Sequence, residues 1–226
     1  MALYTMSKSQ SADIINSAVL TIQAAADVLM NSKFSATAID TFRSKVSGTL
    51  KRSAGQLVAL GWSDGNGDGK VDPSIYSRYI NEQLHFLELW IADIGAAGKL
   101  VGGAGRAGMY GESLGQAYQR AYILARGSRV GLPELPAYPR DGSTVCLTHC
   151  RCQWKLKKVS AVYYEATWKL GPAEHCPNCI ERGDLWSPLS IIRQQGRGAD
   201  DVLTQGDWIM SDTRGREVKT GSVALA

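Results

Sequence analysis

All five cysteines of the chain lie between Cys146 and Cys179, in two close groups that could bind a metal ion. The first group holds Cys146, Cys150 and Cys152, and the second holds Cys176 and Cys179. Thiolates brought together from two such groups form the tetrahedral sites that zinc occupies in small domains. The sequence therefore predicts a structural Zn²⁺ ion held by four of the five cysteines. A site with four protein ligands has no open position for a substrate, so the predicted ion stabilises the fold and does no chemistry.

The cysteine pattern leaves several alternatives open. The first group offers three thiols, and His149 and His175 each adjoin a cysteine, so they are substitute ligands. Buried free thiols in an ordinary β core are the simplest alternative to a metal site. A redox pair at Cys176 and Cys179 is a further alternative, but such a pair normally follows a buried strand, and the residues at 171–175 favour no strand.

A second candidate metal site lies at residues 64–72, which match the first nine positions of an EF-hand calcium loop. The expected ligands are Asp64, Asn66, Asp68, the main-chain carbonyl of Lys70, and Asp72 through a water. The twelfth position is Ile75, where the motif needs a bidentate glutamate. The expected calcium affinity is therefore low unless Glu82 or a neighbouring chain completes the shell. A polar turn between two helices is the alternative.

Apolar residues at helical spacing predict four helices in the first half of the chain. The first covers residues 9–30, and the second begins after a cap at Ser35 or Thr37 and ends near Gly61. Pro73 suits the first position of the third helix. Residues 95–111 are rich in glycine and favour a flexible hinge over a phosphate-binding loop, and the fourth helix is predicted at residues 112–126.

The second half of the chain has a different residue pattern from the first. Three prolines between residues 133 and 139 favour a stiff, extended connector. Beyond it, Cys152, Trp154 and Leu156 alternate as in a strand, and residues 162–170 are rich in aromatic and β-branched side chains. The predicted fold is α+β. A helical domain at 1–130 and a Pro-rich connector at 131–143 precede a cysteine-rich zinc-binding β module at 144–192 and an extended tail at 193–226. Trp154, Trp168 and Trp186 are expected to pack around the zinc.

Composition excludes several classes of function. The chain has 226 residues, 44% of them hydrophobic, with a net charge of +4, which is too mild to indicate a nucleic-acid-binding protein. No apolar run reaches the roughly 18 residues of a membrane span, and no secretory signal is evident, so a protein made in the cytosol is expected. No catalytic motif is recognisable, and Glu174-His175 lacks the ligand order of a zinc deaminase, so no enzyme activity is predicted.

Residues 122–189 resemble the C-terminal module of minor structural proteins of tailed bacteriophages. The resemblance covers less than a third of the chain. It rests on these motifs: 125–133 (ARGSRVGLP), 135–139 (LPAYP), Asp141-Gly-Ser-Thr144, Cys146-x3-Cys150-Arg-Cys152-x-Trp154, Trp168, Cys176-Pro-Asn-Cys179 and Trp186-Ser-Pro188-Leu189. Proteins of this kind are encoded near the portal and act in head morphogenesis or in the head–tail connector.

The resemblance implies a non-enzymatic virion protein made in the host cytoplasm. Its expected place is the neck, as an adaptor subunit that forms a ring with copies of itself at the portal. Its expected partners are portal, neck and tail proteins, with DNA passing nearby unread and no membrane. Two alternatives remain: a minor capsid or head morphogenesis protein, and a zinc-ribbon module that binds nucleic acid through Arg151, Lys155, Lys157 and Lys158.

Overall fold

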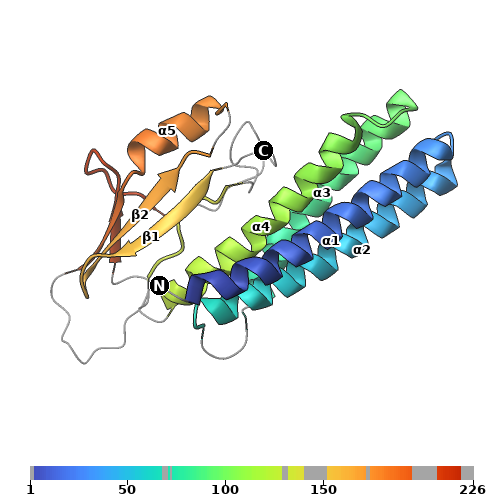
Figure 1. Ribbon diagram of the computed structural model, residues 1–226. Helices are drawn as coiled ribbons and strands as arrows, with labels where there is room; N and C mark the ends of the chain where they lie inside the picture. Colours follow the sequence, from blue (N-terminus) through green and yellow to red (C-terminus); the bar gives the residue numbers. More distant parts are fainter. Residues whose placement is uncertain are drawn as a thin grey trace. The chain divides into compact units, whose positions relative to one another are not determined.

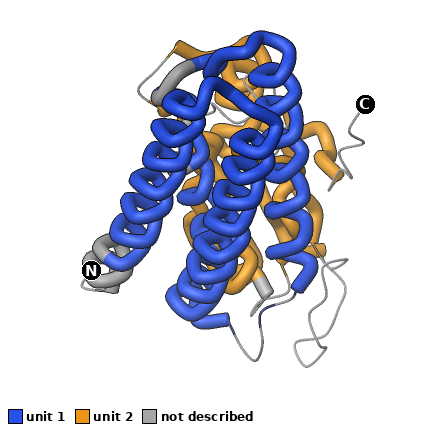
Figure 2. The backbone as a smooth tube through the Cα atoms, turned by 90° about the vertical axis from the view of Figure 1, so that its right-hand side faces the viewer, with its two compact units in different colours: residues 1–122 blue, residues 123–226 orange. Residues whose placement is uncertain are grey.

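The computed structural model describes residues 3–67, 71, 73–128, 132–139, 152–171, 174–194 and 208–219. The chain forms two compact units, residues 1–122 and 123–226, which Figure 2 shows in different colours. The first unit is a bundle of helices, and the second holds a four-stranded antiparallel sheet. The predicted α+β fold, with a helical bundle followed by a β region that carries the cysteines, is confirmed.

Four long helices make up the bundle (Figure 1): α1 Leu3–Asn31, α2 Ala36–Asp64, α3 Pro73–Ala97 and α4 Gly103–Ser128, whose last turns belong to the second unit. The predicted start signals are confirmed. Ser35 is the N-cap of α2, where its hydroxyl accepts a hydrogen bond from the Ala38 N–H at 3.3 Å. Pro73 opens α3, where its missing N–H costs nothing because the first N–H groups of a helix have no partner in the helix.

The apolar stripes of the four helices form the core of the bundle. The largest fully buried aliphatic side chains in it are Ile22, Leu29, Leu50, Leu57, Leu87, Ile94 and Leu114. Trp90 of α3 is also fully buried, and its ring packs edge-on to Phe42 with the centroids 5.2 Å apart. On α4, Tyr110 stacks against the same indole at 5.5 Å. The aromatic contacts of Trp90 thus link α2, α3 and α4.

Two helix boundaries differ from the predicted ones, and close packing explains the early start of α4. The sequence predicted a break at Gly61 and a hinge at residues 95–111, but α2 continues to Asp64 and α4 begins at Gly103. The first turns of α4 are held by packing, since Tyr110 is buried against Trp90 and the Arg106 guanidinium lies 5.4 Å from the centre of that indole. These tertiary contacts outweigh the low helix propensity of the glycines.

Gly61 is required where α2 crosses α4. A Cβ atom at this position would lie 2.3 Å from the carbonyl oxygen of Tyr118 and 3.2 Å from the Cβ of Ala121. We predict that Gly61→Ala lowers the free energy of unfolding of the bundle by ~1–3 kcal/mol, because two backbones would have to separate. Urea denaturation followed by circular dichroism would measure the loss.

Gly48 is the matched control for this substitution, because it lies in the same helix and a Cβ there would meet no atom within 4 Å. Gly48→Ala should raise stability by ~0.5–1 kcal/mol through its higher helix propensity. Equal effects of the two substitutions would contradict the proposed close approach of α2 and α4.

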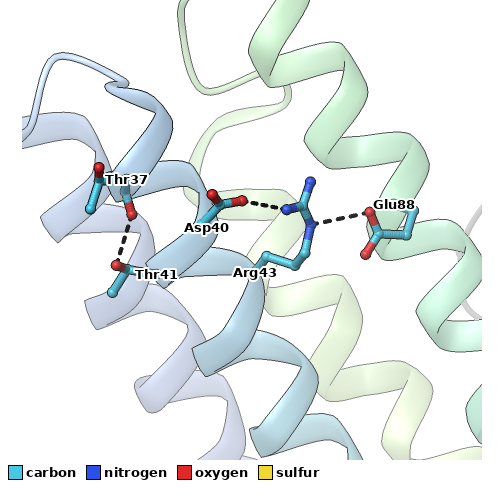
Figure 3. Close-up of polar contacts among 5 residues, drawn as sticks. All are labelled: Thr37, Asp40, Thr41, Arg43 and Glu88. Carbon is cyan, nitrogen blue, oxygen red and sulfur yellow. Dashed lines mark hydrogen bonds and ion pairs between the residues drawn. The ribbon is translucent and has the colours of Figure 1, made fainter.

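On the bundle surface, Arg43 of α2 lies between Asp40 of the same helix and Glu88 of α3, with its Nε 3.2 Å from the Glu88 carboxylate (Figure 3). In the same view, the Thr41 hydroxyl donates a hydrogen bond to the Thr37 carbonyl oxygen at 2.8 Å. All of these groups are exposed, so each ion pair contributes at most ~1 kcal/mol. The bundle is therefore held mainly by its apolar core.

The expectation that no apolar run is long enough for a membrane span is wrong by length and composition alone, because the Gln10–Asn31 stretch of α1 meets both requirements. Core helices of bundles meet the same criterion. Here the stretch packs Ile22, Ala26 and Leu29 into the bundle and leaves Leu20 and Val28 exposed. We therefore assign it to the bundle.

The second unit contains strands β1 Gln153–Lys158, β2 Tyr163–Lys169, β3 Leu189–Arg193 and β4 Trp208–Ser211, with helix α5 Pro177–Leu185 between β2 and β3. The strands pair antiparallel in chain order, with Trp154 opposite Trp168, Ala166 opposite Leu189, and Ile191 opposite Met210. These paired residues are all buried, whereas their neighbours along the strands are more exposed. The strands predicted around Trp154 and in residues 162–170 are therefore confirmed.

The segment interpreted as an extended tail supplies the edge strand of this sheet. Trp208 and Met210 of β4 are buried, and a turn after the strand is closed by Asp212. Burial opposes ionisation of Asp212, but hydrogen bonds from the main-chain N–H groups of Arg214 and Arg216 and from the Arg216 guanidinium outweigh it. The pKa of Asp212 therefore lies below its ordinary value. The sheet of the second unit thus extends beyond the predicted module boundary at residue 192.

Candidate metal centre

Three cysteines that are far apart in the sequence meet in the second unit. Cys152 immediately precedes β1, and Cys176 and Cys179 lie at the start of α5. The three thiols are 3.5–3.6 Å apart. Cys152 and Cys179 are almost fully buried, Cys176 is half-buried, and none of the three is in a disulfide. The predicted meeting of the two cysteine groups is confirmed for these three residues.

The start of α5 explains why Cys176 and Cys179 face the same place. Cys176 is the N-cap of the helix, with an extended backbone at φ −69° and ψ 157°, and Pro177 follows at the first helical position. The Cys176 carbonyl accepts hydrogen bonds from the N–H groups of Cys179 at 3.0 Å and Ile180 at 3.1 Å. This turn brings the two thiols together, and the positive end of the helix dipole favours negative charge on them.

Tryptophan side chains support the sheet beside Cys152. Trp154 packs edge-on to Trp168 at 5.2 Å and stacks on Trp186 at 5.7 Å, and its indole N–H donates to the Ala137 carbonyl at 2.7 Å. The Arg182 guanidinium of α5 lies 5.3 Å from the centre of the Trp168 ring and 5.1 Å from that of Trp186. The three predicted tryptophans therefore pack together and tie β1, β2 and α5 into one unit.

His175 is the described histidine that touches the thiol cluster. Its Nδ1 lies 3.9 Å from the Cys152 sulfur, and its Nε2 lies 2.9 Å from the carbonyl oxygen of Gly171. The side chain is half-buried. By contrast, His85 is exposed on α3.

The remaining predicted ligands fall elsewhere. Cys146, His149 and Cys150 lie outside the described residues. Within the described part of the chain, no complete group of metal ligands is found around these three cysteines. The arrangement is thus a partial, thiol-rich site of the kind that soft or borderline cations such as Zn²⁺ and Cu⁺ prefer.

The second predicted metal site is only partly described. The Asp64 carboxylate, at the end of α2, accepts a hydrogen bond from the Tyr118 hydroxyl at 2.8 Å and so connects α2 to α4. Asn66 has a left-handed backbone with φ +56°. Ile75 is buried in α3, and Glu82 lies 3.9 Å from Arg120. Asp68, Lys70 and Asp72 lie outside the described residues, so calcium binding stays a prediction.

One buried polar cluster in the bundle was not predicted. Gln83 is fully buried inside the apolar stripe of α3, where its Oε1 accepts a hydrogen bond from the Ser113 hydroxyl at 2.7 Å. That hydroxyl also lies 3.4 Å from the Tyr79 hydroxyl. The sequence signal was available, because Gln83 is one helical turn from Tyr79 and Leu87 on the buried face. The cluster links α3 to α4 and holds no group poised as a nucleophile or base.

Comparison with protein-family models, curated proteins and solved structures found no match to this chain.

Proposed function

We propose that this chain is a non-enzymatic structural protein of a tailed-bacteriophage virion, a head–tail connector subunit that assembles into a ring at the portal. The observation that carries the proposal is the thiol cluster of Cys152, Cys176 and Cys179, with its 3.5–3.6 Å spacing. These cysteines belong to the motifs that resemble the phage proteins. A structural Zn²⁺ ion at this place would stabilise the small β unit, which suits a structural protein better than an enzyme.

The physical reason for zinc here is the size of the β unit. Its described strands have four to seven residues each, so the sheet is small even though Trp154, Trp168 and Ile191 are buried in it. A bound Zn²⁺ would add its binding free energy to the folding of the unit, because the site exists only in the folded state. Cys152, Cys176 and Cys179 would hold the ion between β1 and α5, together with a fourth ligand.

The bundle offers a surface for subunit contacts in such a ring. Leu20 and Val28 of α1 are 66% and 61% exposed. An apolar hollow of 260 Å³ lies between α1 and α2, lined in part by Ala25, Leu29 and Phe42. Repeated head-to-tail contacts between identical subunits close into rings when the rotation between neighbours permits it. Copies of the chain, or portal and neck proteins, would therefore pack against this surface of the bundle.

A minor capsid or head morphogenesis protein is the nearest alternative within the same class. Nucleic-acid binding by the β unit is less well supported. Lys157 already pairs with Glu165 at 3.3 Å, and Trp154 and Trp168 are buried, so their faces are not available to stack on bases. DNA binding that falls steeply with salt would favour this alternative.

The proposal is tested by the mass and the metal content of one preparation of the full-length protein. We expect one Zn²⁺ per chain by elemental analysis and, by native mass spectrometry, a ring-sized oligomer, either alone or after mixing with the portal protein of the same virus. A metal-free protein that stays monomeric with and without the portal would overturn the proposal.

A further inference from the structure

We propose that His175 supplies the fourth ligand of the metal site through its Nδ1 atom, so that Cys152, Cys176, Cys179 and His175 form a closed Cys₃His centre. This inference rests on the proposed zinc-binding role of the β unit and names the ligand that the cysteine pattern alone leaves open. It implies that neither Cys146 nor Cys150 is needed to hold the ion.

The spacing of the four donor atoms fits one Zn²⁺ ion. With Zn–S bonds of about 2.3 Å and Zn–N bonds of about 2.0–2.1 Å, a tetrahedral site has S–S edges of roughly 3.8 Å and S–N edges of roughly 3.6 Å. The three thiols lie 3.5–3.6 Å apart, and Nδ1 lies 3.9 Å from the Cys152 sulfur. The spacing of the three thiols and the distance from Nδ1 to the Cys152 sulfur thus differ from these ideal values by a few tenths of an ångström.

The hydrogen bond on the far side of the ring is a second, independent observation. A main-chain carbonyl can only accept, so the contact of 2.9 Å between His175 Nε2 and Gly171 O requires the proton on Nε2. In a neutral imidazole, Nδ1 then carries the lone pair, and this atom faces the Cys152 sulfur. Metal-bound histidines show the same arrangement, in which the non-bonding ring nitrogen donates to a carbonyl and fixes the ring.

A closed site also excludes catalysis by the metal ion, because no position is left for water or substrate. Catalytic zinc centres keep three protein ligands and leave the fourth position to water or substrate. With His175 in that position, the three thiols form a structural site that cannot activate water. His175 therefore separates the structural interpretation from a zinc hydrolase built on the same three cysteines.

X-ray absorption at the zinc edge of the full-length protein tests the inference directly. We expect a shell of three sulfurs at about 2.3 Å and one nitrogen at about 2.0–2.1 Å. His175→Cys should keep one Zn²⁺ per chain and convert the shell to four sulfurs. A wild-type shell of four sulfurs would overturn the inference and leave the proposed function standing, whereas a protein without zinc would overturn both.

Competition with a zinc-binding dye provides a second readout. We expect His175→Gln to weaken Zn²⁺ binding by more than the 10–100-fold that loss of an outer hydrogen-bonding partner typically causes. His149→Gln and His85→Gln, the other two histidines, are matched controls and should bind as the wild type does. Cys146→Ser and Cys150→Ser should also retain the ion. Loss of zinc in either serine variant, with retention in His175→Gln, would reject His175 as the ligand.

Discussion

Replacing Cys179 with serine should unfold the sheet unit and leave the helical bundle folded. Cys179 is 1% exposed and one of the three clustered thiols, so under the proposed zinc-binding role serine removes a ligand. Structural zinc contributes an apparent binding free energy of about 10–16 kcal/mol at neutral pH. The net stability of a whole domain is only about 5–15 kcal/mol. If the sheet unit loses the binding free energy of zinc, its remaining interactions are too weak to keep it folded.

Tryptophan fluorescence and far-ultraviolet circular dichroism would separate the two units in this experiment. The variant should lose the buried emission of the Trp154, Trp168 and Trp186 cluster and keep most of its helical signal, which arises from α1–α4. A chelator should produce the same change in the wild type and none in the variant.

Ile180→Ala is the matched control for Cys179→Ser, because Ile180 is the next residue in α5 and is 48% exposed. It should leave both zinc content and fluorescence unchanged. A folded, zinc-loaded Cys179→Ser protein would show that Cys179 is not a ligand. Loss of an enzymatic turnover without unfolding would instead support the thiol oxidoreductase alternative.

Replacing Trp90 with alanine should be the most damaging single substitution in the bundle. The indole is fully buried between Phe42 and Tyr110, and its N–H donates to the Val101 carbonyl at 2.9 Å. Removing a buried aromatic side chain of this size costs about 3–5 kcal/mol through lost apolar burial and the cavity left behind. The expected consequences are a lower urea midpoint of the helical transition and fraying of the early turns of α4.

Leu89→Ala is the control for this prediction, because Leu89 is the preceding residue and is 47% exposed. It should change the stability of the bundle by less than about 0.5 kcal/mol. Because the chain has two units, the comparison uses the helical circular dichroism signal rather than a single global transition. Similar urea midpoints for the two variants would mean that Trp90 does not hold the three helices together.

Much of the fold could be predicted from local patterns. The helix starts at Ser35 and Pro73 follow from the chemistry of helix ends, which depends on a few adjacent residues. The alternation around Trp154 predicts a strand because a sheet with one buried face repeats every two residues. The expected meeting of the cysteine groups followed from residue type and spacing.

The glycine-rich start of α4 could not be predicted in the same way. Residues 103–111 read as a hinge because glycine is a poor helix former, but the stacking of Tyr110 on Trp90 holds them in a helix. Similarly, the isolated apolar residues Trp208 and Met210 joined the sheet only through pairing with β3. In both cases the deciding contact comes from a residue distant in the chain.

By itself, the sequence determined the succession of amphipathic helices and alternating strands and restricted the candidate zinc ligands to a short cysteine-rich region. Tertiary structure decided that Cys152 joins Cys176 and Cys179, and that the imidazole of His175 faces the Cys152 thiol. The physical reason is that periodicity and end signals act over a few neighbouring residues, whereas a cluster of side chains depends on how distant backbones approach one another.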